Sequence, residues 1–171
     1  MVLCAHSDAG FHNEIKGRII TGAHILLSKN YAMPQWNGSV ITLTQIIKFV
    51  VSFTSEAELG ALFTTAQEMV AMRNTLEEMK LTQPKSPIQT DKSSTAGVVN
   101  NNIVPRKLKT MDRRLHWLRC REAQGQFRYY WAIGSLNWID YSTKHHPSLY
   151  HESKRIQFAV NTDSIKYIRY H

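Results

Sequence analysis

Acidic side chains are scarce in this sequence. Its 171 residues include 13 Asp and Glu against 21 Lys and Arg, which gives a formal net charge of +8. The balance favours a polyanionic partner over a cationic one, because Lys and Arg that neutralise phosphates release condensed counterions. Charge indicates the class of partner but no chemistry. A cluster of acids inside such a basic chain would therefore be conspicuous.

Cysteine and long apolar runs are also in short supply. The two cysteines, Cys4 and Cys120, lack the Cys and His spacing of a metal site, and we expect both to be buried free thiols in a reducing compartment. No stretch is long and apolar enough to span a membrane, and no charged region followed by an apolar run opens the chain. The sequence therefore predicts a soluble intracellular monomer, in the cytoplasm or nucleus, that is not secreted and has no membrane partner.

The size of the chain and its 43% hydrophobic content suit one compact domain with a real core. Beyond Pro147 the sequence is polar and basic with no clear period. We therefore expect one domain over 1–146 and a basic C-terminal tail over 147–171.

Hydrophobic periodicity predicts alternating strands and helices. Short β-rich runs at 2–8, 21–28, 40–43, 88–90 and 126–131 are typical of strands. Apolar residues at three- and four-residue intervals predict a long helix over 55–80, with Ser55 as its N-cap, and a second amphipathic helix follows Pro105 and closes near Gly125. Short helices are expected within 92–101 and around Asp140. This order predicts an α/β fold with part of its sheet parallel.

Four acids stand at the ends of these elements: Asp8, Glu58, Asp91 and Asp140. Carboxylates far apart in sequence that converge in space are what a magnesium-dependent nuclease needs, because Mg²⁺ prefers hard oxygen ligands. In phosphodiester hydrolysis two such ions about 4 Å apart activate the attacking water and stabilise the leaving oxygen. The four positions are therefore candidate metal ligands.

Each acid also has a simpler structural explanation. Ser55 and Glu58 match a capping box, in which the Glu satisfies the N-cap amide. Asp8 and Asp91 alone could be ordinary strand-end or turn residues, and Asp140 alone could be an acid favoured at a helix N-terminus. The order and context of all four together favour a site.

That combined pattern resembles the ribonuclease H domain of retrotransposon Pol polyproteins, most closely the copia type. The block Glu-Ala-Glu-Leu, a later strand-end Asp and a late Asp-x-x-Thr-Lys carry most of the specificity. The matching pieces are Ser-Asp-Ala-Gly at 7–10, Thr-Gly-Ala-His-Ile at 21–25, Ser-Glu-Ala-Glu-Leu-Gly-Ala-Leu at 55–62, Thr-Asp-Lys-Ser-Ser at 90–94, Met-Asp-Arg-Arg-Leu-His-Trp-Leu-Arg at 111–119 and Asp-Tyr-Ser-Thr-Lys at 140–144.

The resemblance implies a ribonuclease H-like fold, a five-stranded mixed sheet flanked by helices. It implies an endonuclease that hydrolyses the RNA strand of RNA–DNA hybrids by a two-metal mechanism, as part of a reverse transcriptase in a parent polyprotein. The implied cofactor is a pair of Mg²⁺ ions, with Mn²⁺ as the alternative. In such families the second Glu of the block is the ligand, which assigns Glu58 rather than Glu56. The implied catalytic and metal-binding residues are Asp8, Glu58, Asp91 and Asp140.

Basic residues beside these acids are candidates for binding the hybrid, although a solvated helix face explains the helical ones equally well. His145, His146 and His151 have no accompanying ligand pattern, and a solvated basic tail explains them better than a metal site. The candidate nucleic-acid-binding residues are Lys92, Ser93, Lys107, Lys109, Arg113, Arg114 and Lys144.

Some residues depart from the family pattern. Lys92 stands where a short neutral amide is more usual, and Trp138 and Ile139 crowd the position before Asp140, where a small residue is expected. These departures, together with a first strand that directly follows Met1, favour a detached copy of such an element. They leave two alternatives open: a catalytically impaired nucleic-acid-binding remnant of the same fold, and a nuclease acting on DNA junctions.

Overall fold

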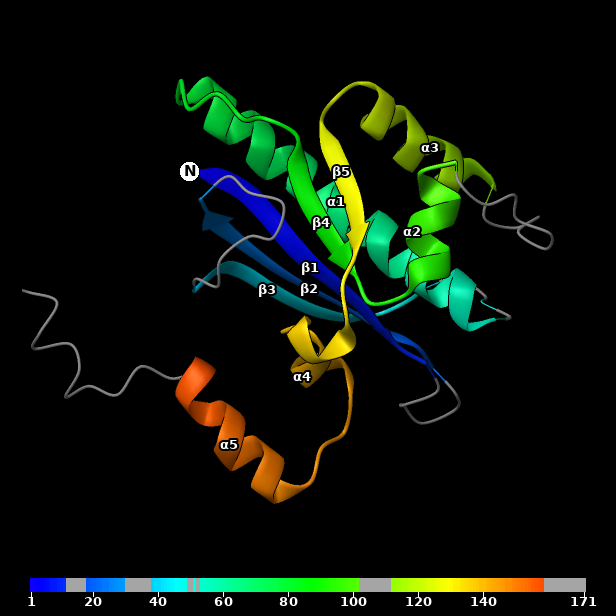
Figure 1. Ribbon diagram of the computed structural model, residues 1–171, viewed down its shortest axis with the longest axis vertical. Helices are drawn as coiled ribbons and strands as arrows, with labels where there is room; N and C mark the ends of the chain where they lie inside the picture. Colours follow the sequence, from blue (N-terminus) through cyan, green and yellow to red (C-terminus); the bar gives the residue numbers. More distant parts are fainter. Residues whose placement is uncertain (12–17, 30–37, 49–50, 52, 102–111, 159–171) are drawn as a thin grey trace, which may run out of the picture.

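A five-stranded mixed sheet forms the centre of the protein in a computed structural model (Figure 1). The structure describes residues 1–11, 18–29, 38–48, 51, 53–101 and 112–158. Strands β1, β2 and β3 pair antiparallel, whereas β4 is parallel to β1 and β5 is parallel to β4, in the order β3-β2-β1-β4-β5. The strands are β1 Val2–Gly10, β2 Ile20–Ser28, β3 Ser39–Ile46, β4 Ser86–Thr90 and β5 Phe127–Trp131.

Among the described residues, four helices occur where the sequence predicts them, and a 3-10 turn over 134–136 and a helix over 148–158 are additional. The long helix α1 precedes β4, and α2 and α3 separate β4 from β5, so the chain makes the crossovers that parallel strands require. The helical elements are α1 Thr54–Glu78, α2 Ser93–Val99, α3 Asp112–Ala123, the short 3-10 turn η2 Gly134–Leu136, α4 Asp140–Thr143 and α5 Ser148–Phe158. The expected α/β fold with a mixed sheet is confirmed.

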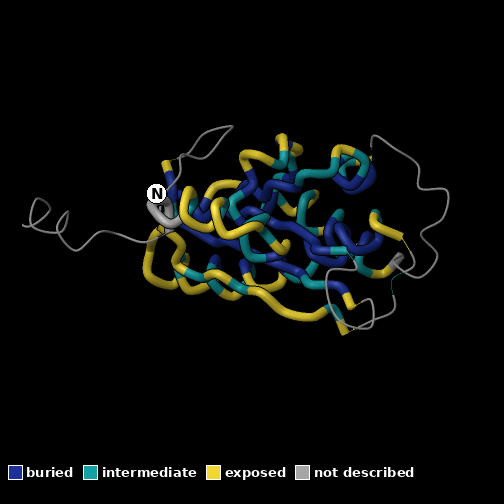
Figure 2. The backbone as a smooth tube through the Cα atoms, turned by 90° about the horizontal axis from the view of Figure 1, so that it is seen from below, coloured by how far each residue is buried: buried dark blue, intermediate teal, exposed yellow. Residues whose placement is uncertain are grey.

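The main core lies between one face of the sheet and helices α1, α2 and α3. Figure 2 shows the buried segments running through the middle of the molecule, with exposed segments around them. The alternation of β1 sends Leu3 and Ala5 into this core, and apolar residues of the helices pack against them. Its fully buried large side chains include Leu3, Ile25, Leu59, Leu62, Met69, Ile88, Leu118 and Phe127.

Strand β1 presents different chemistry on its two faces. Ser7 faces α1, because the Thr65 hydroxyl donates to its Oγ over 3.1 Å. Asp8 is the next residue and therefore points to the opposite face. Gly22 of β2 is the register partner of Asp8, so a position without a side chain lies beside this carboxylate.

Arg73 ties α1 to the segments around β4. Its guanidinium is buried and donates to the Gln126 carbonyl over 3.2 Å, to the Ser86 hydroxyl over 3.0 Å and to the carbonyls of Gln83 and Pro84. It also pairs with Glu77 over 3.1 Å. This one side chain satisfies carbonyls from two connections, which fixes the position of α1 against the start of β4.

Two expectations about local structure are wrong, and one helix is additional. Residues 148–158, within the expected basic tail, form the helix α5, while the division into a domain over 1–146 and a tail stays a prediction. Cys120 is exposed and only Cys4 is buried, because Cys120 lies two residues after Leu118 and so on the outer side of α3. Helix α1 begins at Thr54 after Phe53, with no side-chain hydrogen bond at its cap, so Ser55 is not the N-cap.

Some expectations lie outside the described residues. They are the bases Lys107 and Lys109 and the last part of the tail, 159–171. Within the described part of the chain, no helix has the length and apolar character needed to cross a membrane.

Candidate metal centre

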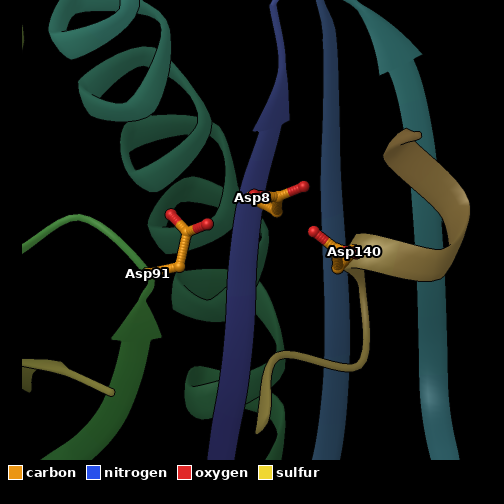
Figure 3. Close-up of side chains that lie close together, drawn as sticks. All are labelled: Asp8, Asp91 and Asp140. Atoms are coloured by element: carbon orange, nitrogen blue, oxygen red, sulfur yellow. The ribbon is translucent and has the colours of Figure 1, made fainter. Parts of the chain in front are cut away.

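Three aspartates from distant parts of the chain meet at one edge of the sheet (Figure 3). Asp8 lies near the end of β1 and Asp91 directly follows β4, and because these strands are parallel their C-terminal ends lie at the same edge. Asp140 begins α4, which packs against β1 and β2. One carboxylate oxygen of each lies within 4.8 Å of those of the other two.

Gly22 provides the space for α4 to approach. A Cβ atom at Gly22 would lie 2.5 Å from Ile139 Cγ1 and 2.5 Å from Thr143 Cγ2, distances at which something must shift. Ile139 is buried against this gap, and the side-chain amide of Asn137 donates to the Ser7 carbonyl over 2.9 Å. The glycine and these contacts hold Asp140 beside Asp8.

This packing changes the interpretation of two residues expected to crowd Asp140. Ile139 fills the space above Gly22 rather than pushing the carboxylate away. Trp138 is half-buried and lies against the ring of His24, with 5.8 Å between ring centroids. Both residues therefore fix α4 on the sheet.

Thr143 and Lys144 complete the surroundings of the three aspartates. The Thr143 hydroxyl donates to Asp8 Oδ2. The Lys144 ammonium forms an ion pair with Asp140 and lies 3.9 Å from Asp8 Oδ1 and 4.0 Å from Asp91 Oδ2. Burial opposes the charged form of Lys144, yet the carboxylates of Asp8, Asp140 and Asp91 raise its pKa above the ordinary value.

Glu58 lies outside the group of three but in the same region. It lines a cavity of about 620 Å³ together with Asp91, Lys92 and Lys144. Its side chain is buried, and its Oε2 has no hydrogen-bond partner within the described part of the protein. Since α1 starts at Thr54, Glu58 is a residue of the first turns and the capping-box explanation for it is wrong.

The buried carboxyls resist ionisation in the absence of a cation. Burial raises the pKa of Asp8 to about 6, with Lys144 and the Thr143 hydrogen bond opposing and the charges of Asp91 and Asp140 adding to the rise. Burial and the charges of Asp8 and Asp91 raise the pKa of Glu58 to about 9, opposed by Lys92 and Lys144. A bound cation would relieve both effects.

The donor set fits a hard divalent cation. Four carboxylates supply only oxygen ligands, which suit Mg²⁺ or Mn²⁺ and do not suit metals that prefer sulfur. Asp8 Oδ1 and Glu58 Oε2 are buried without a hydrogen-bond partner among the described residues, as ligand atoms awaiting a cation would be. The acidic cluster is therefore suited to metal binding by its chemistry as well as its geometry.

Some of the candidate nucleic-acid-binding residues border this site. Lys92 and Lys144 line the cavity that contains Glu58, and Ser93 is exposed at the start of α2. Arg113 and Arg114 lie on α3, away from the cluster in sequence, and the Arg114 guanidinium rests over the Phe63 ring at 5.7 Å. Arg114 therefore has a packing role as well as a charge.

Sequence reasoning missed two neighbours of the acids. It assigned no role to Thr143, although its spacing of three residues from Asp140 places both on one side of a helical turn. It treated His146 as part of a solvated cluster, whereas His146 Nε2 lies 4.0 Å from Asp140 Oδ2 and 3.2 Å from the Asp140 carbonyl. The rings of His146 and Tyr150 stack at 4.2 Å, which links α5 to the segment after α4.

Similarity to known proteins agrees with this arrangement. The chain is 26% identical over 118 residues to a retrovirus-related Pol polyprotein from transposon TNT 1-94 of Nicotiana tabacum. The match covers 69% of this chain, and the chain spans 8% of that polyprotein. No protein-family model matches the chain.

Solved structures identify the fold. A ribonuclease H1 isolated from compost, LC11-RNase H1, superposes with a TM-score of 0.62 at 12% identity, over 82% of this chain and 91% of that one. The same enzyme in complex with an RNA/DNA hybrid gives a TM-score of 0.60 at 11% identity, over 82% and 98% of the two chains. The N-terminal ribonuclease H domain of Rv2228c from Mycobacterium tuberculosis gives 0.59 at 14% identity, over 81% and 88%. The chain has the ribonuclease H fold.

Proposed function

We propose that this ribonuclease H fold is a metal-dependent endonuclease that hydrolyses the RNA strand of RNA–DNA hybrids, as the ribonuclease H part of a retrotransposon reverse transcriptase. The observation that carries the proposal is the convergence of Asp8, Asp91 and Asp140 at one sheet edge, with the buried Glu58 beside them. The similarity to a transposon Pol polyprotein supports the setting. The proposed partner is accordingly a reverse transcriptase domain of the same polyprotein.

The carboxylates have distinct tasks in this reaction. Asp8, Asp91 and Asp140 are the proposed ligands that hold the cations on a rigid sheet edge, and Glu58 is the proposed ligand on the side of the larger cavity. Two bound Mg²⁺ ions would activate the attacking water and stabilise the leaving oxygen. Thr143 orients Asp8 by donating to its Oδ2, which leaves Oδ1 as the oxygen available to a cation.

The substrate class follows from charge and from the cavity. A net charge of +8 favours a polyanion, and Lys92 and Lys144 place two ammonium groups beside the acids where a backbone phosphate would approach. One enzyme of this fold has been crystallised with an RNA/DNA hybrid. We therefore assign a hybrid, rather than duplex DNA or a DNA junction, as the substrate.

The test is a cleavage assay with matched substrates. The purified chain is incubated with an RNA–DNA hybrid, a DNA duplex and a four-way DNA junction of the same sequence, with Mg²⁺ or Mn²⁺. The proposal expects cuts in the RNA strand of the hybrid alone, and expects Asp8→Asn to lower the rate by at least about 100-fold while the fold persists. Preferential cutting of the junction would overturn the substrate assignment, and binding without any cleavage would overturn the activity.

A further inference from the structure

The Lys144 ammonium lies among the same oxygen atoms that are the proposed metal ligands. Its Nζ pairs with Asp140 Oδ1 and lies 3.9 Å from Asp8 Oδ1 and 4.0 Å from Asp91 Oδ2. One carboxylate oxygen from each of these aspartates lies within 4.8 Å of the other two. A single side chain of this protein therefore contacts the whole group of three carboxylates.

The Lys144 ammonium and a metal ion compete for these ligands. The ammonium occupies the position among the carboxylate oxygens that a bound cation would take, and it repels a divalent ion placed a few ångströms away. Lys144 and a metal ion are therefore alternative occupants of the group formed by Asp8, Asp91 and Asp140.

The position of Lys144 allows its ammonium to move away from the three carboxylates. It follows α4 directly, its side chain is 38% exposed, and its four-carbon stem is flexible. It also lines the cavity of about 620 Å³ that contains Glu58, Lys92 and His145. The ammonium therefore has open space beside the cluster, on the side from which a substrate phosphate would approach.

We propose that Lys144 is an internal cation that holds the three aspartates together in the metal-free protein, competes with the metal ion for them, and on displacement turns into the adjacent cavity to meet a substrate phosphate. The proposal rests on the proposed metal site and adds a specific consequence. Metal and substrate binding reinforce each other, because each favours the state in which Lys144 has left the carboxylates.

Lys92 supplies the matched control. It is a lysine lining the same cavity, yet the described part of the chain contains no ion pair between Lys92 and the three aspartates. Lys92→Met and Lys144→Met remove the same charge from the same region, and only the second removes a cation from among the ligands. Lys144→Arg keeps a cation there.

The experiment measures Mn²⁺ affinity by calorimetry, and thermal unfolding of the metal-free protein, for the wild type and the three variants. We expect Lys144→Met to bind Mn²⁺ at least about tenfold more tightly, Lys92→Met to gain no more than about threefold, and Lys144→Arg to stay near the wild type. We also expect Lys144→Met to lower the melting temperature of the metal-free protein by about 3 °C. Added Mn²⁺ should raise the melting temperature of Lys144→Met by more than it raises that of the wild type.

Equal or weaker Mn²⁺ binding by Lys144→Met, relative to Lys92→Met, would overturn the proposal, and so would an absence of Mn²⁺ binding in every variant. The affinity measurement needs no cleavage. Tighter binding by Lys144→Met in a chain that does not cut hybrids would support the role of Lys144 and contradict the proposed function. Hybrid cleavage by the wild type, together with an unchanged Mn²⁺ affinity in Lys144→Met, would support the proposed function and contradict the role of Lys144.

Discussion

At the scale of single residues, burial opposes the ionisation of two acids, Asp8 and Glu58. Both side chains are buried, and burial raises the pKa of Asp8 to about 6 and that of Glu58 to about 9. In the proposed function both are metal ligands, which packing must hold in place. Without metal, the folded state therefore keeps Glu58 protonated at neutral pH and holds the proton of Asp8 to a higher pH than the unfolded chain does.

This preference predicts how the stability of the metal-free protein changes with pH. The pKa of Glu58 is raised from 4.5 to about 9 on folding, so between these values the folded state binds more protons than the unfolded state. The stability associated with protonated Glu58 is fully present below pH 4.5 and is lost as the pH rises through about 9. Between pH 7 and pH 9, the free energy of unfolding should therefore fall, by up to about 1.4 kcal/mol per pH unit.

Urea unfolding at a series of pH values in this window measures the effect. His6 contributes little in this window, because burial lowers its pKa to about 4 in the folded protein and its ordinary pKa of 6.5 leaves it mostly neutral in the unfolded chain. Glu58→Gln should flatten the profile, whereas Glu68→Gln, an exposed position on the same helix, should leave it unchanged. An equally steep profile in Glu58→Gln would show that another group is responsible.

The candidate ligands could be predicted from sequence at this scale, but the contacts around them could not. Asp8 lies near the end of a strand, Asp91 follows a strand and Asp140 begins a helix, and that order indicates convergence once the strands are known to be parallel. The ion pairs of Lys144 depend on the path of the chain after α4, which no local pattern specifies. The exposure of Cys120 depends on which side of α3 meets the core.

At the scale of elements, the one-turn helix α4 determines whether the site is complete. It carries Asp140, Thr143 and the connection to Lys144, and it rests on β2 because Gly22 leaves room for Ile139 and Thr143. So short a helix has little stability of its own, and its position comes from these tertiary contacts.

A methyl group at Gly22 should therefore displace α4. In Gly22→Ala the new Cβ would lie 2.5 Å from atoms of both Ile139 and Thr143, so Asp140 and the Thr143 hydroxyl must move away from Asp8. We expect Mn²⁺ affinity and hybrid cleavage to fall by about tenfold or more, measured by calorimetry and by a cleavage assay.

Gly38→Ala is the control for this change, because a Cβ at Gly38 meets nothing within 4 Å. It should bind Mn²⁺ and cut the hybrid as the wild type does. Wild-type metal affinity in Gly22→Ala would show that α4 does not need the close approach to β2.

The sequence predicts elements well where their pattern is long, and less well where it is short. The three- and four-residue spacing along α1 identifies that helix to within two residues at each end, and the strands β1 and β2 are found nearly in full. Helix α5 escapes prediction because it is short and most of its residues are polar or charged, which leaves few apolar positions to define a period. Its contacts to the preceding segment run from Tyr150 to the ring of His146 and from His151 to the Tyr141 hydroxyl, and such side-chain contacts leave no periodic signal in the sequence.

At the scale of the whole molecule, the chain combines a basic overall charge with an acidic site. The net charge of +8 attracts a polyanion, while Asp8, Asp91 and Asp140 repel its phosphates unless cations intervene. Productive substrate binding should therefore need both the basic residues and the metal ions.

Hybrid binding should accordingly weaken as salt rises. For the cleavage-deficient variant Asp8→Asn, three neutralised phosphates would lower the affinity roughly 40-fold between 50 mM and 200 mM salt. Fluorescence anisotropy of a labelled hybrid at four salt concentrations measures the slope of log K against log salt. An affinity that does not change over this range would contradict binding through phosphates.

The most direct test of the central claim is the rate of RNA-strand cleavage in a hybrid at saturating Mg²⁺, compared between the wild type, Glu58→Gln and the control Glu68→Gln. The proposed site predicts that the wild type and Glu68→Gln cut at the same rate and that Glu58→Gln is slower by at least about 100-fold, with its circular dichroism spectrum unchanged. Cleavage by Glu58→Gln at the wild-type rate, or an absence of cleavage by the wild type with both Mg²⁺ and Mn²⁺, would contradict it.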